Sequence, residues 1–549
     1  MKTRIPLKAG SRFGGACRLV LLMPGMAALL LLAPGPASAA TLNVCPSGCP
    51  YTQLAPAVAA AHNGDTIRIG PGTYAGGVTI DASVDVVGAG AGLTTIRGGG
   101  PVLTIGTFGA LSEPTVSIDG ITITGGVTRS SPESTPFAGE EGVIALGGGV
   151  DIPPNADFSG GATVRIRNTA ITGNRVAPTT TLPFGPPCPA GPCPFAWAKG
   201  GGIDSWGTLT LDHTTISGNR VGSASGLSTL ASDAAGAGIM SWLDALTVRN
   251  SVISGNVASA TAPNGRFAEG GGIWVEGGPV VTMSDSSVTN NSAVLNAALP
   301  ASVELLAQPG GIFISDDVAR ASITNTTISG NSATMTNSVG DATAFAGGIN
   351  VGPDVDFRMA NSVVAGNTVT STTLPGSHGD AEGDTGGGAL LGTIGNTRFT
   401  GNTVTVTSAA GDATAFAGAL IDFGTITNGV ISDNHVHASS PGGTVFAAGG
   451  GIVVDEPGLT VRNSEVSGNT VGANGASGST RGGGLFDAPI ANGPPGGPLK
   501  LLNSGVTGNA LSGSPGNALQ GGGLYIENKP LTLTNSFIAS NSPDQCFGC

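Results

Sequence analysis

The sequence predicts an all-β protein, a right-handed parallel β-helix (solenoid) of roughly 13–14 coils with a short N-terminal capping helix. A cassette recurs along the 549 residues, for example as GGGIDSWGTLTLDHTTISGN at 200–219 and GGGIVVDEPGLTVRNSEVSGN at 449–469. A repeat at a fixed period indicates a solenoid. The cassette ends in a motif like N-S-x-I-S-G-N, which occurs eleven times at intervals of 32 to 45 residues. The last residues of these copies are Asn174, Asn219, Asn256, Asn291, Asn331, Asn367, Asn402, Asn434, Asn469, Asn509 and Asn541.

Within a cassette, apolar residues alternate with a period of two. In the segment 273–276, IWVE, Ile and Val share one face, and Trp and Glu share the other. Leu209 and Leu211 repeat this spacing. The pattern and the β-branched content are typical of strands, and no helical period occurs inside the repeats, which argues against a solenoid of alternating strands and helices.

Glycine and asparagine mark the corners of the coils. Glycine accepts positive φ, and asparagine tolerates the left-handed region better than most residues. Equivalent corners would stack about 4.8 Å apart, so that Asn side chains bond to one another in ladders. The segments between one ending and the next glycine cluster vary most, and we interpret them as loops or strand extensions that project from one corner.

Residues 1–39 have the pattern of a signal peptide. Five basic residues precede or flank an apolar run over 19–33, and the segment 37–39, ASA, is a plausible cleavage site. An N-terminal membrane anchor is the alternative, but a Pro-Gly pair at 24–25 interrupts a run that is already shorter than a spanning helix. We therefore expect a secreted or cell-surface protein with no transmembrane span in the mature chain.

Residues 40–125 are expected to form the N-terminal cap and the first coils. The segment 52–61, TQLAPAVAAA, is a candidate helix, and strands closed by glycine follow it. An open β-helix end exposes apolar core, and this helix would cover it. Residues 126–541 would form the repeat β-helix with long variable loops, and 542–549 a cysteine-containing tail.

The charge balance excludes some partners. The chain has 22 basic and 35 acidic residues, a formal net charge of −13. Without the signal peptide, 22 − 5 = 17 basic residues remain, and the net charge becomes −18. Such a surface repels nucleic acid and anionic membranes. We expect a monomer with a polysaccharide or cell-surface partner.

Six cysteines of the mature chain form three close pairs. In an exported protein, local disulfides are the favoured interpretation, and structural zinc is the alternative. No pair has a second ligand pair or a histidine nearby in the sequence. The disulfide candidates are Cys45 with Cys49, Cys188 with Cys193, and Cys546 with Cys549.

The N-terminal region carries a family resemblance. The string YTQLAPAVAAAHNGDTIRIGPGTYAGGVTI and the following VDVVGAGAGLTTIRG resemble the capping segment of the pectin-lyase-like right-handed parallel β-helix superfamily. The GGGI and NSxISGN cassettes resemble bacterial secreted β-helix repeat proteins, including the repeats of polymorphic outer-membrane proteins. The resemblance covers about residues 45–545 and implies the fold. It does not fix an activity, because the superfamily includes lyases, hydrolases and adhesins.

No catalytic residue is evident from the sequence. The Asp, Arg and His motif sets of pectate lyases and polygalacturonases are absent, and the string Arg165-Ile166-Arg167 is interpreted as surface charge. The five histidines are scattered, and His435 and His437 are expected to lie on a solvated strand face. No cofactor is required. Calcium is possible, because acidic residues recur after the glycine-led strand and could align into a column: Glu276, Asp316, Asp422, Asp455, Asp487 and Glu527.

Aromatic residues in successive cassettes are the candidate carbohydrate-binding site: Trp206, Trp242, Trp274 and Phe313. If the leading Ile faces the core, all of them face outward, where they could stack on sugar rings. Long loops that fold over and bury them are the alternative, and a register shift of one residue would reverse the inference.

Three functions fit these observations. The first is a non-catalytic β-helix that presents a long face for adhesion or carbohydrate binding. The second is a polysaccharide lyase or glycoside hydrolase. The third is a passenger segment of a surface-display system. Three carboxylates within about 5 Å of one another beside a Lys or Arg would favour the enzyme, whereas a flat aromatic row would favour binding.

Overall fold

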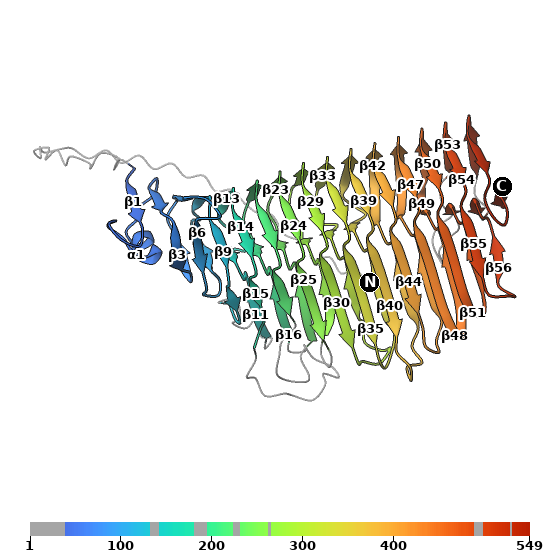
Figure 1. Cartoon of the computed structure of the whole chain (residues 1–549), viewed down its shortest axis with the longest axis horizontal. Coiled ribbons are helices and arrows are strands. Elements are labelled where there is room, and N and C mark those ends of the chain that lie inside the picture. Colours follow the sequence, from blue (N-terminus) through green and yellow to red (C-terminus); the bar gives the residue numbers. More distant parts are fainter. Residues whose placement is uncertain are drawn as a thin grey trace, which may run out of the picture. The chain divides into compact units, whose positions relative to one another are not determined.

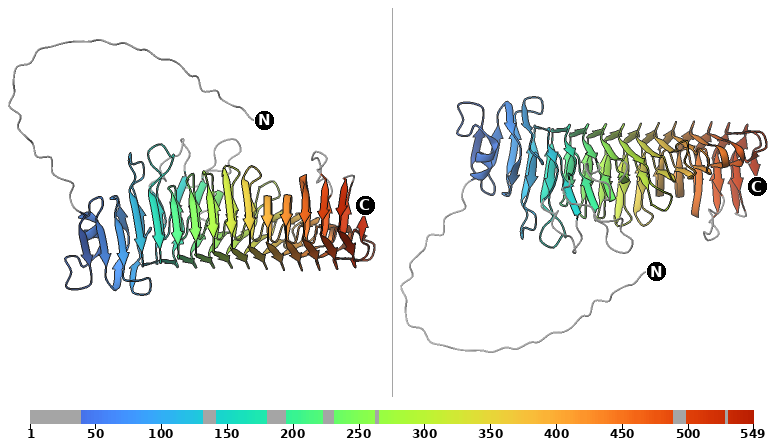
Figure 2. Two further views of the ribbon diagram at one scale, coloured as in Figure 1. Left: turned by 90° about the horizontal axis from the view of Figure 1, so that it is seen from above. Right: turned by 90° about the horizontal axis from the view of Figure 1, so that it is seen from below.

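The computed structural model describes residues 39–131, 142–179, 195–222, 231–261, 265–487, 498–527 and 530–549. These residues form a right-handed parallel β-helix, as predicted, and the strand pairs of all three of its sheets are parallel (Figure 1). Among the described residues, the smallest of the three sheets, which we call sheet B, has 14 strands from β3 (Gly72–Ala75) to β59 (Phe537–Ala539), in agreement with the predicted 13–14 coils. Figure 2 shows the coils stacked along one axis, from β1 (Thr41–Val44) to β60 (Cys546–Phe547).

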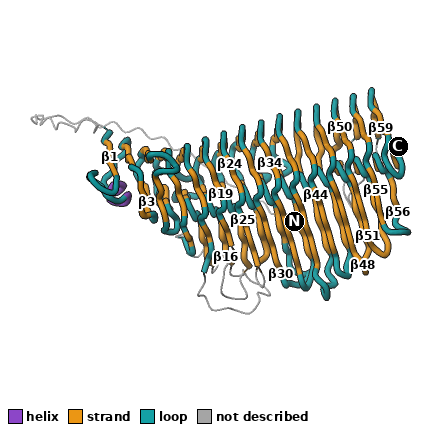
Figure 3. The backbone as a smooth tube through the Cα atoms, viewed as in Figure 1, coloured by secondary structure: helices purple, strands orange, loops and turns teal. Residues whose placement is uncertain are grey.

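The coil that begins at Ile273 shows the general plan. Strands β27 (Ile273–Val275) and β28 (Val281–Ser284) lie in the 26-stranded sheet A, and β29 (Ser287–Thr289) lies in sheet B. Strands β30 (Ser292–Ala297) and β31 (Leu306–Gln308) lie in the 20-stranded sheet C. Figure 3 labels β30 among the stacked strands of the solenoid. The following coils continue with β32 (Ile312–Ile314), β33 (Arg320–Thr324), β34 (Thr327–Ser329), β35 (Ser332–Asn337), β36 (Ala342–Phe345) and β37 (Ile349–Val351).

The body of the solenoid has a continuous aliphatic core. Nearly every strand of sheet B contributes a buried residue, such as Ile253, Val288 and Ile328, that packs against alternating residues of sheet A. Because equivalent residues occupy the same place in each coil, the core consists of stacked columns of Ile, Val and Leu. The predicted period of two is therefore the alternation between core and surface.

Sheet C forms a thinner arm beside the body. In each coil one strand runs outward and a second returns, and the two contact each other, as β25 (Val257–Thr261) and β26 (Gly265–Glu269) do. The buried residues between these two layers are mostly alanine and valine, which allows the layers to approach closely. In the described residues, the variable segments are thus strand extensions, one of the two predicted forms.

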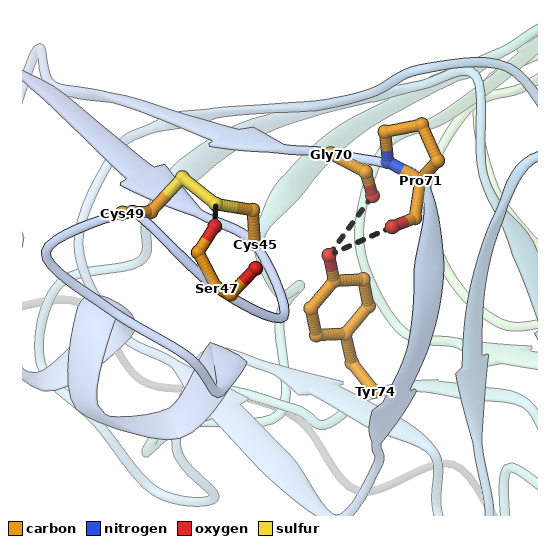
Figure 4. Close-up of a disulfide and its surroundings, with 6 residues drawn as sticks. All are labelled: Cys45, Ser47, Cys49, Gly70, Pro71 and Tyr74. Atoms are coloured by element: carbon orange, nitrogen blue, oxygen red, sulfur yellow. Dashed lines mark hydrogen bonds between the residues drawn. A yellow bond between two sulfur atoms is a disulfide. The ribbon is translucent and has the colours of Figure 1, made fainter.

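The N-terminal end contains the predicted helix, shortened to α1 (Leu54–Ala59). Its Leu54 and Ala57 are buried in the body core. A disulfide joins Cys45 to Cys49 near this helix, and the Tyr74 hydroxyl donates a hydrogen bond of 3.0 Å to the carbonyl oxygen of Gly70 (Figure 4).

A second disulfide joins Cys546 to Cys549, so two of the three predicted pairs are present. The third predicted pair, Cys188 with Cys193, lies outside the described residues, as does nearly all of the predicted signal peptide. Among the described residues, no helix has the length and apolar character needed to cross a membrane.

Candidate functional site

The candidate site lies where the returning strand of sheet C turns into the first strand of sheet A. The turn residue has positive φ, with values of 68° at Gly200, 61° at Gly236 and 54° at Gly270. A Cβ atom on these glycines would lie 2.5 to 2.8 Å from the Cβ atom of the residue four positions later. Glycine therefore permits a sharp bend that brings outward side chains of the two strands together. We call the following residues the corner cluster: Trp197, Lys199, Asp204, Trp206, Asp233, Trp242, Glu269, Trp274, Glu276 and Phe313.

The four predicted aromatic residues lie at this corner in two stacked pairs. The rings of Trp206 and Trp242 have centroids 4.5 Å apart and planes 12° apart. The rings of Trp274 and Phe313 have centroids 3.8 Å apart and planes 13° apart. The faces within each pair therefore cover each other.

The two pairs belong to different columns. Trp274 is in register with Met240 and Phe313, so it aligns with a residue two positions before Trp242. Trp274 is buried, with 5% of its surface exposed, whereas Trp206, Trp242 and Phe313 are half-buried. As expected from the sequence, these aromatic side chains alternate with core residues and point away from the core. Carbohydrate binding by them stays a prediction.

The indole N–H groups of Trp242 and Trp274, on neighbouring coils, each donate a hydrogen bond to a carboxylate. The Trp242 Nε1–H donates to Asp204 Oδ1 at 3.2 Å, and the Trp274 Nε1–H donates to Glu276 Oε2 at 2.6 Å. Asp204 is fully buried. These bonds fix the ring orientations and place acidic oxygen atoms along the edge of each aromatic pair.

Lys199 lies at the centre of the cluster and is 7% exposed. Its Nζ is 3.4 Å from Asp233 Oδ2, and it lies 4.8 Å and 5.1 Å from the ring centroids of Trp242 and Trp197. Burial alone lowers the pKa of Lys199, but the Asp233, Glu269 and Glu276 carboxylates outweigh burial and raise the pKa overall. The lysine is therefore held as a cation between aromatic rings and acids.

Glu269 has the most perturbed titration in the cluster. Burial raises its pKa well above the usual value, and the charge of Asp233 adds to the effect. Lys199 and a hydrogen bond from Gln308 act in the opposite direction. A raised pKa favours the protonated form of a carboxyl group, which can donate a hydrogen bond or a proton.

Sequence reasoning missed Lys199, Asp233 and Glu269 as site residues. They belong to three different returning strands, β16 (Phe195–Lys199), β21 (Ala231–Ala235) and β26, and only the stacking of coils brings them together. Lys199 carried a weak signal, because it is one of only three lysines after residue 39.

Other polar residues singled out in the sequence lie elsewhere. Arg165 and Arg167 form ion pairs of 3.9 Å with Asp212 and 3.4 Å with Asp119, with much of each side chain exposed. His435 lies on the outer face of the arm, where its Nδ1 is 2.7 Å from Thr470 Oγ1. This placement fits the interpretation of both features as surface groups.

No metal site is found among the described residues, since no group of three or more His, Cys, Asp or Glu side chains is placed to hold an ion. Calcium binding therefore stays a prediction.

The same corner continues into the C-terminal coils with different residues. Arg481 lies over the rings of Phe446 and Tyr525, at 5.6 Å and 4.8 Å from their centroids. Asp384, at the position equivalent to Lys199, has a buried Oδ1 without a hydrogen-bond partner among the described residues. Burial and, to a smaller extent, Glu382 raise the pKa of Asp384 to about 8.

Comparison with known proteins adds little. No protein-family model matches the chain. No curated protein matches it either. Among solved structures, the chain is similar to the A-module of the mannuronan C-5 epimerase AlgE6 of Azotobacter vinelandii, with 14% identity and a TM-score of 0.26, over 89% of this chain and 94% of that chain. A match this weak carries no argument about function.

Proposed function

We propose that this protein is an exported, non-catalytic β-helix that binds a polysaccharide at the corner cluster and presents it along the solenoid. The observation that carries this proposal is the half-exposed Trp206 and Trp242 pair, bordered by Lys199 and several carboxylates. Aromatic surface combined with a few fixed polar groups is the usual composition of a carbohydrate site. The proposal includes residues 1–39 as a signal peptide, a monomeric mature chain, and membership of the pectin-lyase-like superfamily.

The charge of the site favours a particular class of sugar. Lys199 supplies one positive charge, whereas Asp204, Asp233 and Glu276 supply acidic groups around it. The whole chain is also acidic, with a net charge of −13. A polyuronate would be repelled, so we expect a neutral or amino-sugar polymer.

Glycoside hydrolysis is a second candidate function, and Glu269 is the observation that favours it. Hydrolases use one carboxylic acid with a raised pKa and a second carboxylate that stays ionised. Glu269 fits the first role, and the neighbouring carboxyl groups of Asp233 and Glu276 are the candidates for the second. A lyase fits less well, because lyases act on the uronates that this site repels.

The experiment is a binding and product-release screen with residues 40–549. Pull-down and calorimetry against insoluble and soluble polysaccharides, with and without calcium, should detect binding of a neutral or amino-sugar polymer. Trp242→Ala should abolish this binding, whereas Phe537→Ala, an exposed aromatic residue far along the chain, should not change it. Binding that survives Trp242→Ala, or no binding to any polymer, would rule out the proposed site.

Product release separates the two candidates. If the wild-type protein releases new reducing ends and the Glu269→Gln variant does not, the hydrolase assignment replaces the non-catalytic one. If binding occurs without product, the non-catalytic assignment stands.

A further inference from the structure

The outer face of the arm carries a regular array of hydroxyl groups. It lies on the outward-running strands β35, β40 (Thr368–Thr373) and β44 (Thr403–Thr407). We call the following nine residues the hydroxyl face: Ser332, Thr334, Thr336, Thr368, Thr370, Thr372, Thr403, Thr405 and Thr407. It is the opposite side of the arm from the strands that supply Lys199 and Glu269, so it is separate from the corner cluster.

The hydroxyl face is regular because its strands pair without any register shift. Ser332, Thr368 and Thr403 are direct partners, and the same holds for the two columns beside them. The residues between them, such as Ala333 and Val369, are buried in the arm. Every hydroxyl residue is half-buried and so faces solvent at the surface of a packed sheet.

The spacing of the array follows from strand geometry. Adjacent strands lie about 4.8 Å apart, and alternate residues of one strand are about 6.6 Å apart. In a tetrahedral network with O···O bonds of about 2.75 Å, next-nearest oxygen atoms are about 4.5 Å apart and the axial repeat is about 7.4 Å. Ice is such a network. The two lattices differ by about 0.3 Å per step across the strands and by about 0.8 Å per step along them, so the array matches ice most closely across its three strands.

The charge of the face also fits ice. All nine side chains are neutral, although the chain as a whole has a net charge of −13. An uncharged lattice of water offers no counter-ions, so it is complementary to a neutral surface and not to the acidic ones. The face also has no aromatic ring on which a sugar could stack, which disfavours a polysaccharide here.

Threonine suits this role for a mechanical reason. Its branched Cβ restricts χ1, so the hydroxyl and methyl groups already hold defined positions before binding. Less rotamer entropy is then lost when the face meets an ordered surface. Ser332 is further fixed by the hydrogen bond of 3.0 Å that its Oγ donates to Ser292 Oγ on the neighbouring strand.

We propose that the hydroxyl face binds ice, with Thr368, Thr370, Thr403 and Thr405 at its centre. Bound protein would inhibit the growth and recrystallisation of ice crystals. The proposal does not depend on the function of the corner cluster.

The test measures ice recrystallisation in frozen sucrose solution and thermal hysteresis in a nanolitre osmometer, with purified residues 40–549. Wild-type protein should keep the crystals small and produce a hysteresis gap. Thr370→Tyr and Thr405→Lys, which place bulk or charge on the face, should each lose this activity. Thr282→Tyr, a matched outward-facing threonine on sheet A, should keep it.

Circular dichroism and the melting temperature of each variant show whether it folds. If Thr370→Tyr does not fold, the activity of Thr405→Lys decides the outcome. An inactive wild-type protein would overturn the proposal. Activity that persists in both face variants would also overturn it, as would binding to microcrystalline cellulose or chitin without any effect on ice.

Discussion

The side-chain Oδ1 of Asn331 accepts two hydrogen bonds from Asn291, one from the backbone N–H and one from Nδ2, both at 3.0 Å. The second Nδ2 hydrogen of Asn331 reaches back to the carbonyl oxygen of Val288 at 2.9 Å. The same arrangement links all eleven cassette-ending asparagines, and Gln545 accepts the last bonds from Asn541. All eleven are buried, so this ladder satisfies polar groups that the corners would otherwise leave unpaired.

Breaking the ladder should destabilise the solenoid. Asn331→Ala leaves the Asn291 backbone N–H and one Asn291 Nδ2 hydrogen without their acceptor. It also removes one of the two bonds to the Asn367 Oδ1, which keeps only the bond from the backbone N–H of residue 331. We expect a loss of about 2–4 kcal/mol of unfolding free energy, since each buried unsatisfied group costs about 1–3 kcal/mol. Chemical denaturation of the variant measures the loss. Asn296→Ala, at an exposed position of β30, is the control and should be nearly neutral, and an equal effect of the two variants would disprove the role of the ladder.

Asp384 should make the protein less stable as pH rises. The folded-state pKa of about 8 lies above the unfolded value of about 3.9, so the folded state binds more protons between these limits. Stability therefore falls as pH rises from about 4 to about 8 and is flat above that range.

Asp384→Asn should remove this slope. Because one pKa unit is about 1.4 kcal/mol and Asp384 is only half-buried, we expect a gain on the order of 1–3 kcal/mol at pH 8.5 and little change at pH 4.5. Thermal melts of the wild-type protein and the variant at pH 4.5 and pH 8.5 measure this gain. Asp316→Asn, at an exposed carboxylate, is the control, and a gain of the same size there would refute the assignment to Asp384.

Lys199→Met should destabilise the corner, because it leaves Asp233 and Glu269 without their cation. Removing one partner of a buried ion pair typically costs about 3–5 kcal/mol. The loss should be larger at pH 8 than at pH 5, because the raised pKa of Glu269 favours its neutral form, which needs no cation, as the pH falls. Chemical denaturation of the variant at pH 5 and at pH 8 measures the loss of unfolding free energy. Lys500→Met, at an exposed position, is the control, and a loss that is the same at both pH values would argue against this role of Lys199.

The thin core of the arm should reject larger side chains. Ala344 on β36 is buried between the two layers of sheet C, where most neighbours are also small. Ala344→Leu should cost about 1–3 kcal/mol by overpacking. The outward-facing Thr343→Leu on the same strand should cost far less, and equal melting temperatures for the two variants would contradict the assignment of layers.

The sequence determined the fold because its signals are local and repeated. Asn219 and Asn256 mark equivalent corners, and the alternation around Leu209 sets which side chains enter the core. Each coil repeats these rules, so the fold class and the choice of core-facing residues follow from one cassette, and the number of coils follows from how often the cassette recurs. Two disulfides followed from the spacing of cysteine pairs in the same way.

The sequence could have predicted which aromatic residues of the candidate site share a column, if each residue had been counted from its corner glycine. Trp206 and Trp242 follow Gly200 and Gly236 by six residues, whereas Trp274 follows Gly270 by four. These counts separate the two aromatic columns that the structure shows.

Only the tertiary structure decided what lies beside those columns. Lys199 meets Asp233 and Trp242 because the arm folds back onto the body at a bend, and arm segments differ in length from coil to coil. Stacking along the solenoid follows from periodicity, but contact across the corner depends on the angle and depth at which two sheets meet. That geometry comes from the packing of the alanine-rich arm and is not encoded in any single repeat.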